Sequence, residues 1–220
     1  MGLLDEASTH LGVLNGIGRR LPSPHLLISP YLRREAVLSS RIEGTQTTMS
    51  DLYAAELNQM ELISAPDVQE VQNYVTAHQG ALASDLPLSL RLIREIHRDL
   101  MEGVRGQERH PGEFRTYQNY VGGFSAAEAT YVGPPPDEMR RCLHDFESFI
   151  QSPVLRPLVQ AAVLHYQFEA IHPFGDGNGR VGRLLLAVFL SERGLLPRPL
   201  LYLSAYFERT RDAYYDRLMR

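Results

Sequence analysis

The residues from His172 to Arg183 combine side chains that suit chemistry on a phosphate group. His172 can accept a proton from a hydroxyl nucleophile, and Asp176 offers the oxygen ligands that Mg²⁺ prefers. The turn at residues 177–179 has little side-chain bulk, so its backbone N–H groups can converge on an anion. Arg180 and Arg183 are three residues apart, and two guanidinium groups on one helical face suit several phosphate oxygens. The stretch therefore predicts a phosphate-handling site.

Two apolar runs must position this stretch. The run at residues 164–171 ends at His172, and Pro173 disfavours a helical conformation for the residue before it. His172 should therefore lie at a helix end. Apolar residues recur at helical spacing over residues 180–192, so the turn should lie at a helix N-terminus, where unpaired N–H groups and the helix dipole favour anions.

Simpler interpretations exist for each part. A single histidine at a helix end is usually structural, and Asp-Gly-Asn-Gly is an ordinary turn signal. The spacing of Gly177, Gly179 and Gly182 also matches a dinucleotide-binding fingerprint, which needs a preceding strand and an acidic residue about twenty positions on. The preceding run has a helical pattern and the region near residue 199 is apolar, so we reject the dinucleotide interpretation.

Taken together, His-Pro-Phe-x-Asp-Gly-Asn-Gly-Arg-x-x-Arg resembles the signature of the Fic family, with every motif position filled. The resemblance implies transfer of the AMP part of ATP to a Ser, Thr or Tyr hydroxyl of a target protein. By motif position, it implies these roles: His172 as general base; Asp176 as Mg²⁺ ligand; Gly177, Asn178 and Gly179 as the anion hole for the α- and β-phosphates; Arg180 and Arg183 as ligands of the β- and γ-phosphates; and Phe174 as a buried anchor.

A second stretch, Ser39-Ser40-Arg41-Ile42-Glu43-Gly44, resembles the inhibitory motif of regulated Fic proteins. Residues 33–43 lack Pro and Gly, and Gly44 suits a helix C-cap, so Ser39 and Glu43 should lie one turn apart on one helical face. The resemblance implies that Glu43 pairs with Arg183 and displaces the γ-phosphate, as in the class whose inhibitory helix precedes the core. Without the downstream motif, the simpler interpretation of Glu43 would be a solvated carboxylate near a helix end.

Residues 111–132 contain several side chains with strand preference, and the glycines between them permit a reversal of the chain. The residues with strand preference are Tyr117, Tyr120, Val121, Phe124, Tyr131 and Val132. This segment resembles the Fic flap, a short β-hairpin over the active site. An exposed hairpin edge can bind an extended target segment through its backbone, and Val121, Gly122 and Gly123 are expected to line the nucleotide. The alternative is a plain surface hairpin.

Near the end of the chain, Tyr214 and Tyr215 resemble a tyrosine pair that contacts the nucleoside in relatives. Aromatic faces suit base stacking, but tyrosines on a terminal helix also commonly pack against a core. Relatives usually place an Asn shortly after the pair, and none follows here, so we expect a catalytic core truncated at its C-terminus.

Composition narrows the remaining classes of function. A net charge of -4 argues against a nucleic-acid surface. All 22 basic residues are Arg, which excludes a Walker-type or Schiff-base lysine, and Gly179 occupies the position where kinase-like relatives carry Lys. The single Cys142 excludes an internal disulfide framework and a cysteine metal cluster. Without a signal-like start or an apolar run of ~18 residues, the expected location is the cytoplasm, with no membrane association.

The expected fold is all-α, a Fic-type helical core with a short β-hairpin flap. Residues 1–32 should be an N-terminal segment that is mostly loop, residues 33–86 a helical region with the inhibitory helix at about 33–44, and residues 87–220 the catalytic core. Helices are predicted at residues 33–43, 51–62, 67–82, 89–103, 137–151, 156–171, 180–193 and 205–219, and the joints between them at residues 21–30, 103–112 and 133–136.

The predicted function is protein adenylyl transfer with ATP as substrate and Mg²⁺ as cofactor, autoinhibited by Glu43. The expected partner is a target protein bound along the flap, while self-modification and a homodimer are left open. The same site could instead remove AMP from a modified protein, with Glu43 orienting a water. Some relatives transfer other phosphate-linked groups. A non-catalytic nucleotide-binding or protein-interaction module is the alternative from a different class.

Overall fold

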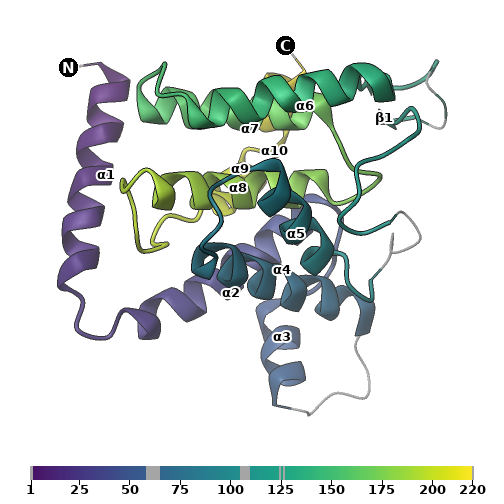
Figure 1. Cartoon of the computed structure of the whole chain (residues 1–220). Helices are drawn as coiled ribbons and strands as arrows, with labels where there is room; N and C mark the ends of the chain where they lie inside the picture. Colours follow the sequence, from purple (N-terminus) through teal and green to yellow (C-terminus); the bar gives the residue numbers. More distant parts are fainter. Residues whose placement is uncertain (1, 58–64, 105–109, 124, 126, 220) are drawn as a thin grey trace.

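The computed structural model describes residues 2–57, 65–104, 110–123, 125 and 127–219, and it is mostly helical (Figure 1). This confirms the predicted fold class of a helical core with one small hairpin. The elements in the described residues are α1 (Leu3–Arg20), α2 (Pro24–Ile42), α3 (Met49–Glu56), α4 (Ala65–Ala83), α5 (Leu90–Leu100), β1 (Tyr120–Val121), β2 (Tyr131–Val132), α6 (Pro136–Gln151), α7 (Pro157–Ile171), α8 (Asn178–Glu192), α9 (Ser204–Arg209) and α10 (Arg211–Leu218).

The core is built around α8, which contacts α2, α4, α5 and α7 (Figure 1). Its residues Val181, Leu184 and Leu185 are fully buried. Gly182 brings α7 close to α8, because a Cβ atom at this position would lie only 2.4 Å from a carboxylate oxygen of Glu169. Packing on several sides fixes the axis of α8, and with it the turn at its N-terminus.

The expectation that residues 1–32 are mostly loop is wrong. α1 covers residues 3–20 and runs along one side of the molecule (Figure 1). Its first turn carries Asp5 and Glu6 and its last turn carries Arg19 and Arg20, the arrangement of charges that complements a helix dipole. Only the short joint before Pro24 separates α1 from α2.

The inhibitory helix predicted at residues 33–43 is the second half of the longer α2. Pro24 occupies a first-turn position, where its missing N–H costs nothing, and Pro30 lies inside the helix. Residues 21–30 are therefore not the joint that their sequence predicts, and the burial of Leu32, Ala36 and Ile42 offsets the backbone hydrogen bond that Pro30 cannot make.

Other boundaries differ locally from the prediction. α3 begins at Met49 because Thr48 and Asp51 form a capping box. The helix predicted at residues 205–219 is divided into α9 and α10 at Thr210, whose φ and ψ of -113° and 36° interrupt the helix. Residues 58–62 of one predicted helix and residues 105–109 of one predicted joint lie outside the described residues.

The hairpin is present but short. Tyr120 pairs with Val132 and Val121 pairs with Tyr131 in an antiparallel ladder. Gly122 and Gly123 have φ values of 71° and 84°, which favour glycine, and allow the chain to turn directly after β1. Phe124, which was also expected to favour a strand, lies outside the described residues.

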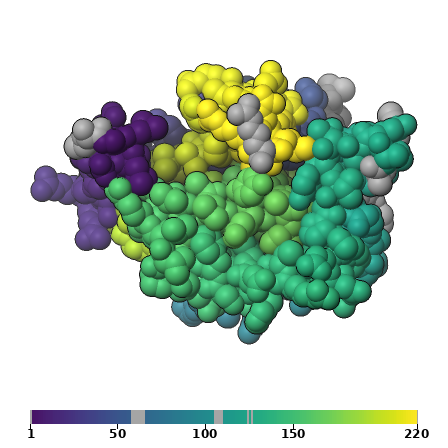
Figure 2. Space-filling view, turned by 90° about the horizontal axis from the view of Figure 1, so that it is seen from above, coloured from purple at the N-terminus to yellow at the C-terminus, as the bar shows by residue number. Residues whose placement is uncertain are grey.

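The C-terminal helices α9 and α10 pack on α2 and α7. In Figure 2 they appear in yellow, between the purple N-terminal helix and the teal hairpin segment. α9 packs on α2, where the buried Glu35 accepts hydrogen bonds from the backbone and hydroxyl of Ser204. Among the described helices, none is both long enough and apolar enough to cross a bilayer.

Candidate active site

His172 lies directly after α7 in a left-handed conformation, with φ 47° and ψ 60°. This conformation is uncommon for a residue with a side chain, and it turns the chain sharply out of the helix. Nδ1 of His172 lies 3.2 Å from the carbonyl oxygen of Glu169, a geometry in which Nδ1 carries the hydrogen and donates it. Burial lowers the pKa of His172, although this hydrogen bond and the charge of Glu43 oppose the effect. The ring therefore favours its neutral form, with Nε2 as the basic atom.

Asn178 holds the turn in shape through its side chain. Its Oδ1 accepts a hydrogen bond from the backbone N–H of Phe174 at 2.9 Å, and its Nδ2 donates to the carbonyl of the same residue at 2.9 Å. The Asn178 side chain is thus occupied within the protein, so only its backbone N–H can serve an anion. Gly177, in the left-handed region at φ 74°, caps the N-terminus of α8.

Phe174 is fully buried and anchors the same turn. Its ring stacks on the His97 ring with centroids 3.7 Å apart and nearly parallel planes. His97 in turn accepts a hydrogen bond at Nδ1 from the backbone of Gly112, and its Nε2 lies 3.1 Å from the carbonyl oxygen of Asp176. His97 therefore fixes both sides of the turn, a role that nothing in the local motif indicated.

Asp176 is the residue of the motif best placed to hold a divalent cation. Its side chain is 48% exposed, and Oδ1 accepts a hydrogen bond from the backbone N–H of Gly177 at 2.6 Å. The described residues contain no cluster of three or more potential metal ligands. A single exposed carboxylate fits Mg²⁺ that takes its other ligands from substrate phosphates and water.

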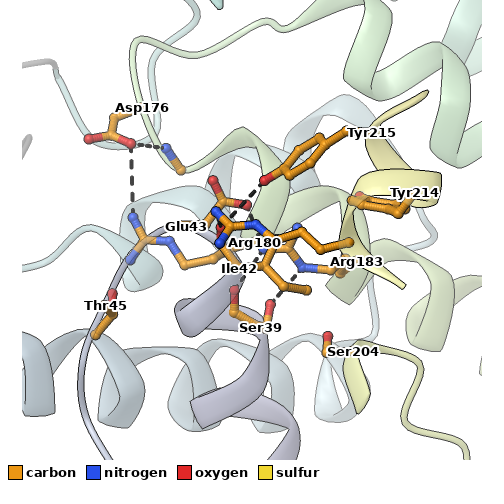
Figure 3. A network of polar contacts seen from close by, with 12 residues as sticks. Ser39, Ile42, Glu43, Thr45, Asp176, Arg180, Arg183, Ser204, Tyr214 and Tyr215 are labelled. Carbon is orange, nitrogen blue, oxygen red and sulfur yellow. Dashed lines mark hydrogen bonds and ion pairs between the residues drawn. The ribbon is translucent and has the colours of Figure 1, made fainter. Parts of the chain in front are cut away.

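The two arginines of the motif are both buried and both paired with glutamates. Nη1 of Arg180 lies 3.1 Å from Oε2 of Glu70, and Nη2 of Arg183 lies 2.7 Å from Oε1 of Glu43. Arg183 also donates from Nε to the hydroxyl of Ser39 and from Nη2 to its carbonyl, each at 2.9 Å. Figure 3 shows Arg183 beside Ser39 and Glu43 at the end of α2.

The carboxylate of Glu43 lies over the first turn of α8. A Cβ atom at Gly179 would lie 2.1 Å from Oε1 of Glu43, so glycine is what permits this approach. Burial opposes ionisation of Glu43, but the charge and hydrogen bond of Arg183 outweigh it and lower the pKa. Burial likewise opposes the charge of Arg183, and the Glu43 carboxylate more than compensates and raises the pKa of the guanidinium. An internal anion therefore lies where the helix N-terminus would bind an external one.

The two tyrosines of α10 have different surroundings. Tyr214 is buried, stacks on Phe207 with centroids 4.6 Å apart, and its hydroxyl lies 2.9 Å from Nε2 of His165. Tyr215 is 37% exposed and donates a hydrogen bond to the carbonyl of Ile42 at 3.3 Å. The ring of Tyr215 is partly open to solvent, whereas Tyr214 packs in the core, and contact of the pair with a nucleoside stays a prediction.

Arg115 joins the hairpin segment to the end of α7. Its buried guanidinium donates to the carbonyls of Ile171, His172, Tyr117 and Pro134. A cation at a helix C-terminus also complements the helix dipole. Asn119, just before β1, donates to the His172 carbonyl at 2.9 Å. Val121, Gly122 and Gly123 follow directly, on the exposed strand and turn.

Glu169 is a further acidic group beside the site, one helical turn before His172. Burial raises its pKa to about 8, although the charge of Arg183 opposes the shift. Arg115, His97, Glu70 and Glu169 were all absent from the sequence prediction. Most contacts of Arg115, His97 and Glu70 are with residues far away in the chain, and local spacing carries no signal of those contacts.

Fold and site define a class: a helical protein with a small-residue turn at a helix N-terminus, an adjacent neutral histidine, and an internal carboxylate that lies over that turn. Two family models match the chain: the Fic/DOC family N-terminal model over residues 1–83 and the Fic/DOC family model over residues 87–190. The chain belongs to the Fic/DOC family.

Relatives and solved structures agree with this assignment. The protein adenylyltransferase Fic of Aedes aegypti is 37% identical over 134 residues, which are 60% of this chain and 24% of the relative. That of Drosophila grimshawi is 38% identical over 121 residues, 54% of this chain and 23% of the relative. This chain therefore spans about a quarter of the length of these relatives.

Among solved structures, a Fic family protein from Desulfovibrio desulfuricans superposes with a TM-score of 0.74 at 26% identity, covering 96% of this chain and 65% of the other. A Fic domain containing signaling protein from Bacteroides thetaiotaomicron superposes with a TM-score of 0.76 at 22% identity, covering 96% and 80%, and shows the common fold.

Proposed function

We propose that this chain transfers AMP from ATP to a hydroxyl side chain of a target protein, and that Glu43 inhibits the reaction. The observation that carries the proposal is the meeting of His172, Asp176 and the N-terminus of α8 in one turn, with the Glu43 carboxylate over Gly179. The relatives named protein adenylyltransferase support the choice of reaction.

In the proposed reaction, the target hydroxyl attacks the α-phosphorus of ATP, and the bond from that phosphorus to the oxygen bridging to the β-phosphate breaks. Nε2 of His172 accepts the hydroxyl proton, and pyrophosphate leaves. The backbone N–H groups of residues 177–179 and the guanidinium of Arg180 stabilise the charge that develops on the phosphates. Mg²⁺ held by Asp176 would supply further neutralisation of the diphosphate.

The proposed inhibition follows from the bonds of Arg183. Its Nε and Nη2 donors are engaged by Ser39 and Glu43. A γ-phosphate can reach Arg183 only when the Glu43 carboxylate moves away. Tyr215 is proposed to contact the nucleoside, and Val121, Gly122 and Gly123 to line the nucleotide.

The domain division also remains a proposal. We assign residues 33–86 to a helical region that carries the inhibitory helix and residues 87–220 to the catalytic core. The target protein is proposed to bind along the exposed edge of the hairpin, where Val121 and Val132 are 38% and 44% exposed.

The direct test compares two labelled forms of ATP with the Glu43→Gly protein and a mixture of candidate target proteins. Label in the α-phosphate should become attached to protein, whereas label in the γ-phosphate should leave with pyrophosphate. His172→Ala in the same background should remove the protein-bound label while keeping the melting temperature. Attachment of the γ-label would instead indicate phosphoryl transfer, and no attachment of either label would favour a non-catalytic nucleotide-binding module.

The reverse reaction is a second candidate because Glu43 is held ionised beside the site. An ionised carboxylate can orient a water for attack on an AMP-modified side chain. Wild-type protein would then release AMP from a modified substrate, and Glu43→Gln would not.

A further inference from the structure

The carboxylate paired with Arg180 is far more deeply buried than the carboxylate paired with Arg183. The side chains of Arg180 and Glu70 are only 4% and 5% exposed, whereas that of Glu43 is 34% exposed. Glu43 can therefore leave its arginine for solvent at low cost, but Glu70 cannot, because a buried carboxylate separated from its partner loses both solvation and pairing. The Arg180–Glu70 pair should persist in every state of the site.

Glu70 is itself fixed from a second direction. Its Oε2 accepts a hydrogen bond from the hydroxyl of Thr45 at 2.9 Å, and α4 anchors its backbone through the buried Val71 and Tyr74. Thr45 follows the inhibitory helix and lies two residues after Glu43. The segment that carries Glu43 thus contacts both motif arginines: it reaches Arg183 directly and Arg180 through Glu70.

The other nitrogen of Arg180 faces the turn. Nη2 lies 3.5 Å from Sδ of Met101 and 4.0 Å from Oδ1 of Asp176. Figure 3 shows the guanidinium between Thr45 on one side and Asp176 on the other. The direction in which Arg180 presents its charge is therefore set by the carboxylate behind it.

On the basis of the proposed function, we propose that Glu70 is a positioning residue for AMP transfer. It orients the guanidinium of Arg180 toward the phosphates and partly neutralises its charge. Two effects follow, and they can be separated. Orientation governs the rate of the transfer step, since a displacement of about 1 Å can cost ~100-fold. The net charge of Arg180 and Glu70 governs how strongly the site attracts the triphosphate of ATP before the reaction.

The test uses two substitutions of Glu70 in the Glu43→Gly background. Glu70→Asp keeps the charge and withdraws the carboxylate by one methylene, so kcat should fall about 10-fold to 100-fold with little change in KM for ATP. Glu70→Gln keeps the reach and removes the charge, so Arg180 should attract ATP more strongly and KM should fall about 3-fold to 10-fold. Melting temperatures and the dissociation constant of ATP in magnesium buffer are measured for each variant.

The matched control is Glu56→Gln, because Glu56 of α3 pairs with Arg33 of α2 at 2.7 Å in a partly exposed ion pair. It should change neither kcat nor KM. Two results would show a merely structural role and overturn the proposal. One is a kcat for Glu70→Asp equal to that of the Glu43→Gly background. The other is a lower melting temperature for Glu70→Gln with an unchanged KM for ATP.

A Glu43→Gly protein without any transfer would refute the proposed function, and ATP binding then decides the role of Glu70. If Glu70→Gln binds ATP more tightly than the background and Glu70→Asp does not, the charge of Glu70 controls the nucleotide site. Equal dissociation constants in both variants and the background overturn it.

Discussion

Removal of the Glu43 carboxylate should activate the protein, and its contacts set the size of the effect. A hydrogen bond to a charged group contributes about 1.5–3 kcal/mol, and the 34% exposure of the Glu43 side chain reduces this through solvent screening to about 1–2 kcal/mol. This energy favours the closed site over one in which Arg183 is available to a γ-phosphate. A loss of 1–2 kcal/mol changes such an equilibrium by roughly 5-fold to 30-fold.

The assay measures initial rates of AMP incorporation at subsaturating ATP for wild type, Glu43→Gly and Glu43→Gln. Glu43→Gly should be about 5-fold to 30-fold faster than wild type, and Glu43→Gln should lie between them, because the amide retains a weaker, neutral hydrogen bond. Glu56→Gly is the matched control, since Glu56 also ends a helix and pairs with an arginine at 2.7 Å, with 33% exposure. Equal rates for wild type and Glu43→Gly, or equal activation by Glu56→Gly, would refute the argument.

Three further predictions concern the turn and its supports. Because burial lowers the pKa of His172, the acid limb of kcat/KM in the Glu43→Gly protein should have its midpoint below the ordinary histidine value of about 6.5; a midpoint at or above this value would contradict a neutral base. Asn178→Ala should lower the free energy of unfolding by about 1–3 kcal/mol in urea titrations, because the buried N–H of Phe174 loses its partner and the carbonyl of Phe174 keeps only the bond from Asn119; a change below about 0.5 kcal/mol would contradict the bracing role. Arg115→Lys should slow transfer and lower the melting temperature, because one ammonium group cannot replace a guanidinium that donates to four carbonyls; wild-type values for both would show that the guanidinium is dispensable.

Local sequence rules succeeded where a feature depends on near neighbours. Pro173 predicts that α7 ends before it, and the structure has α7 ending at Ile171. The same rules failed for residues 1–32, since they predict a joint at residues 21–30, although Pro24 starts α2 and Pro30 is tolerated within it. They also missed the break at Thr210, because no Pro or Gly marks it. Such positions depend on packing against distant elements, which local propensity does not contain.

The sequence by itself determined the chemistry available: a histidine, a carboxylate, a small-residue turn and two arginines within twelve residues, opening a helix. It also supplied the family resemblance that pairs Glu43 with Arg183. Only the tertiary structure decided the state of these groups. Glu43 lies 140 positions from Arg183, and Glu70 lies 110 positions from Arg180, yet each carboxylate bonds its arginine. The packing of α2 and α4 against α8 sets the distances between each carboxylate and its arginine, and burial sets the strength of the two ion pairs. Neither the packing nor the burial can be predicted from local spacing in the sequence.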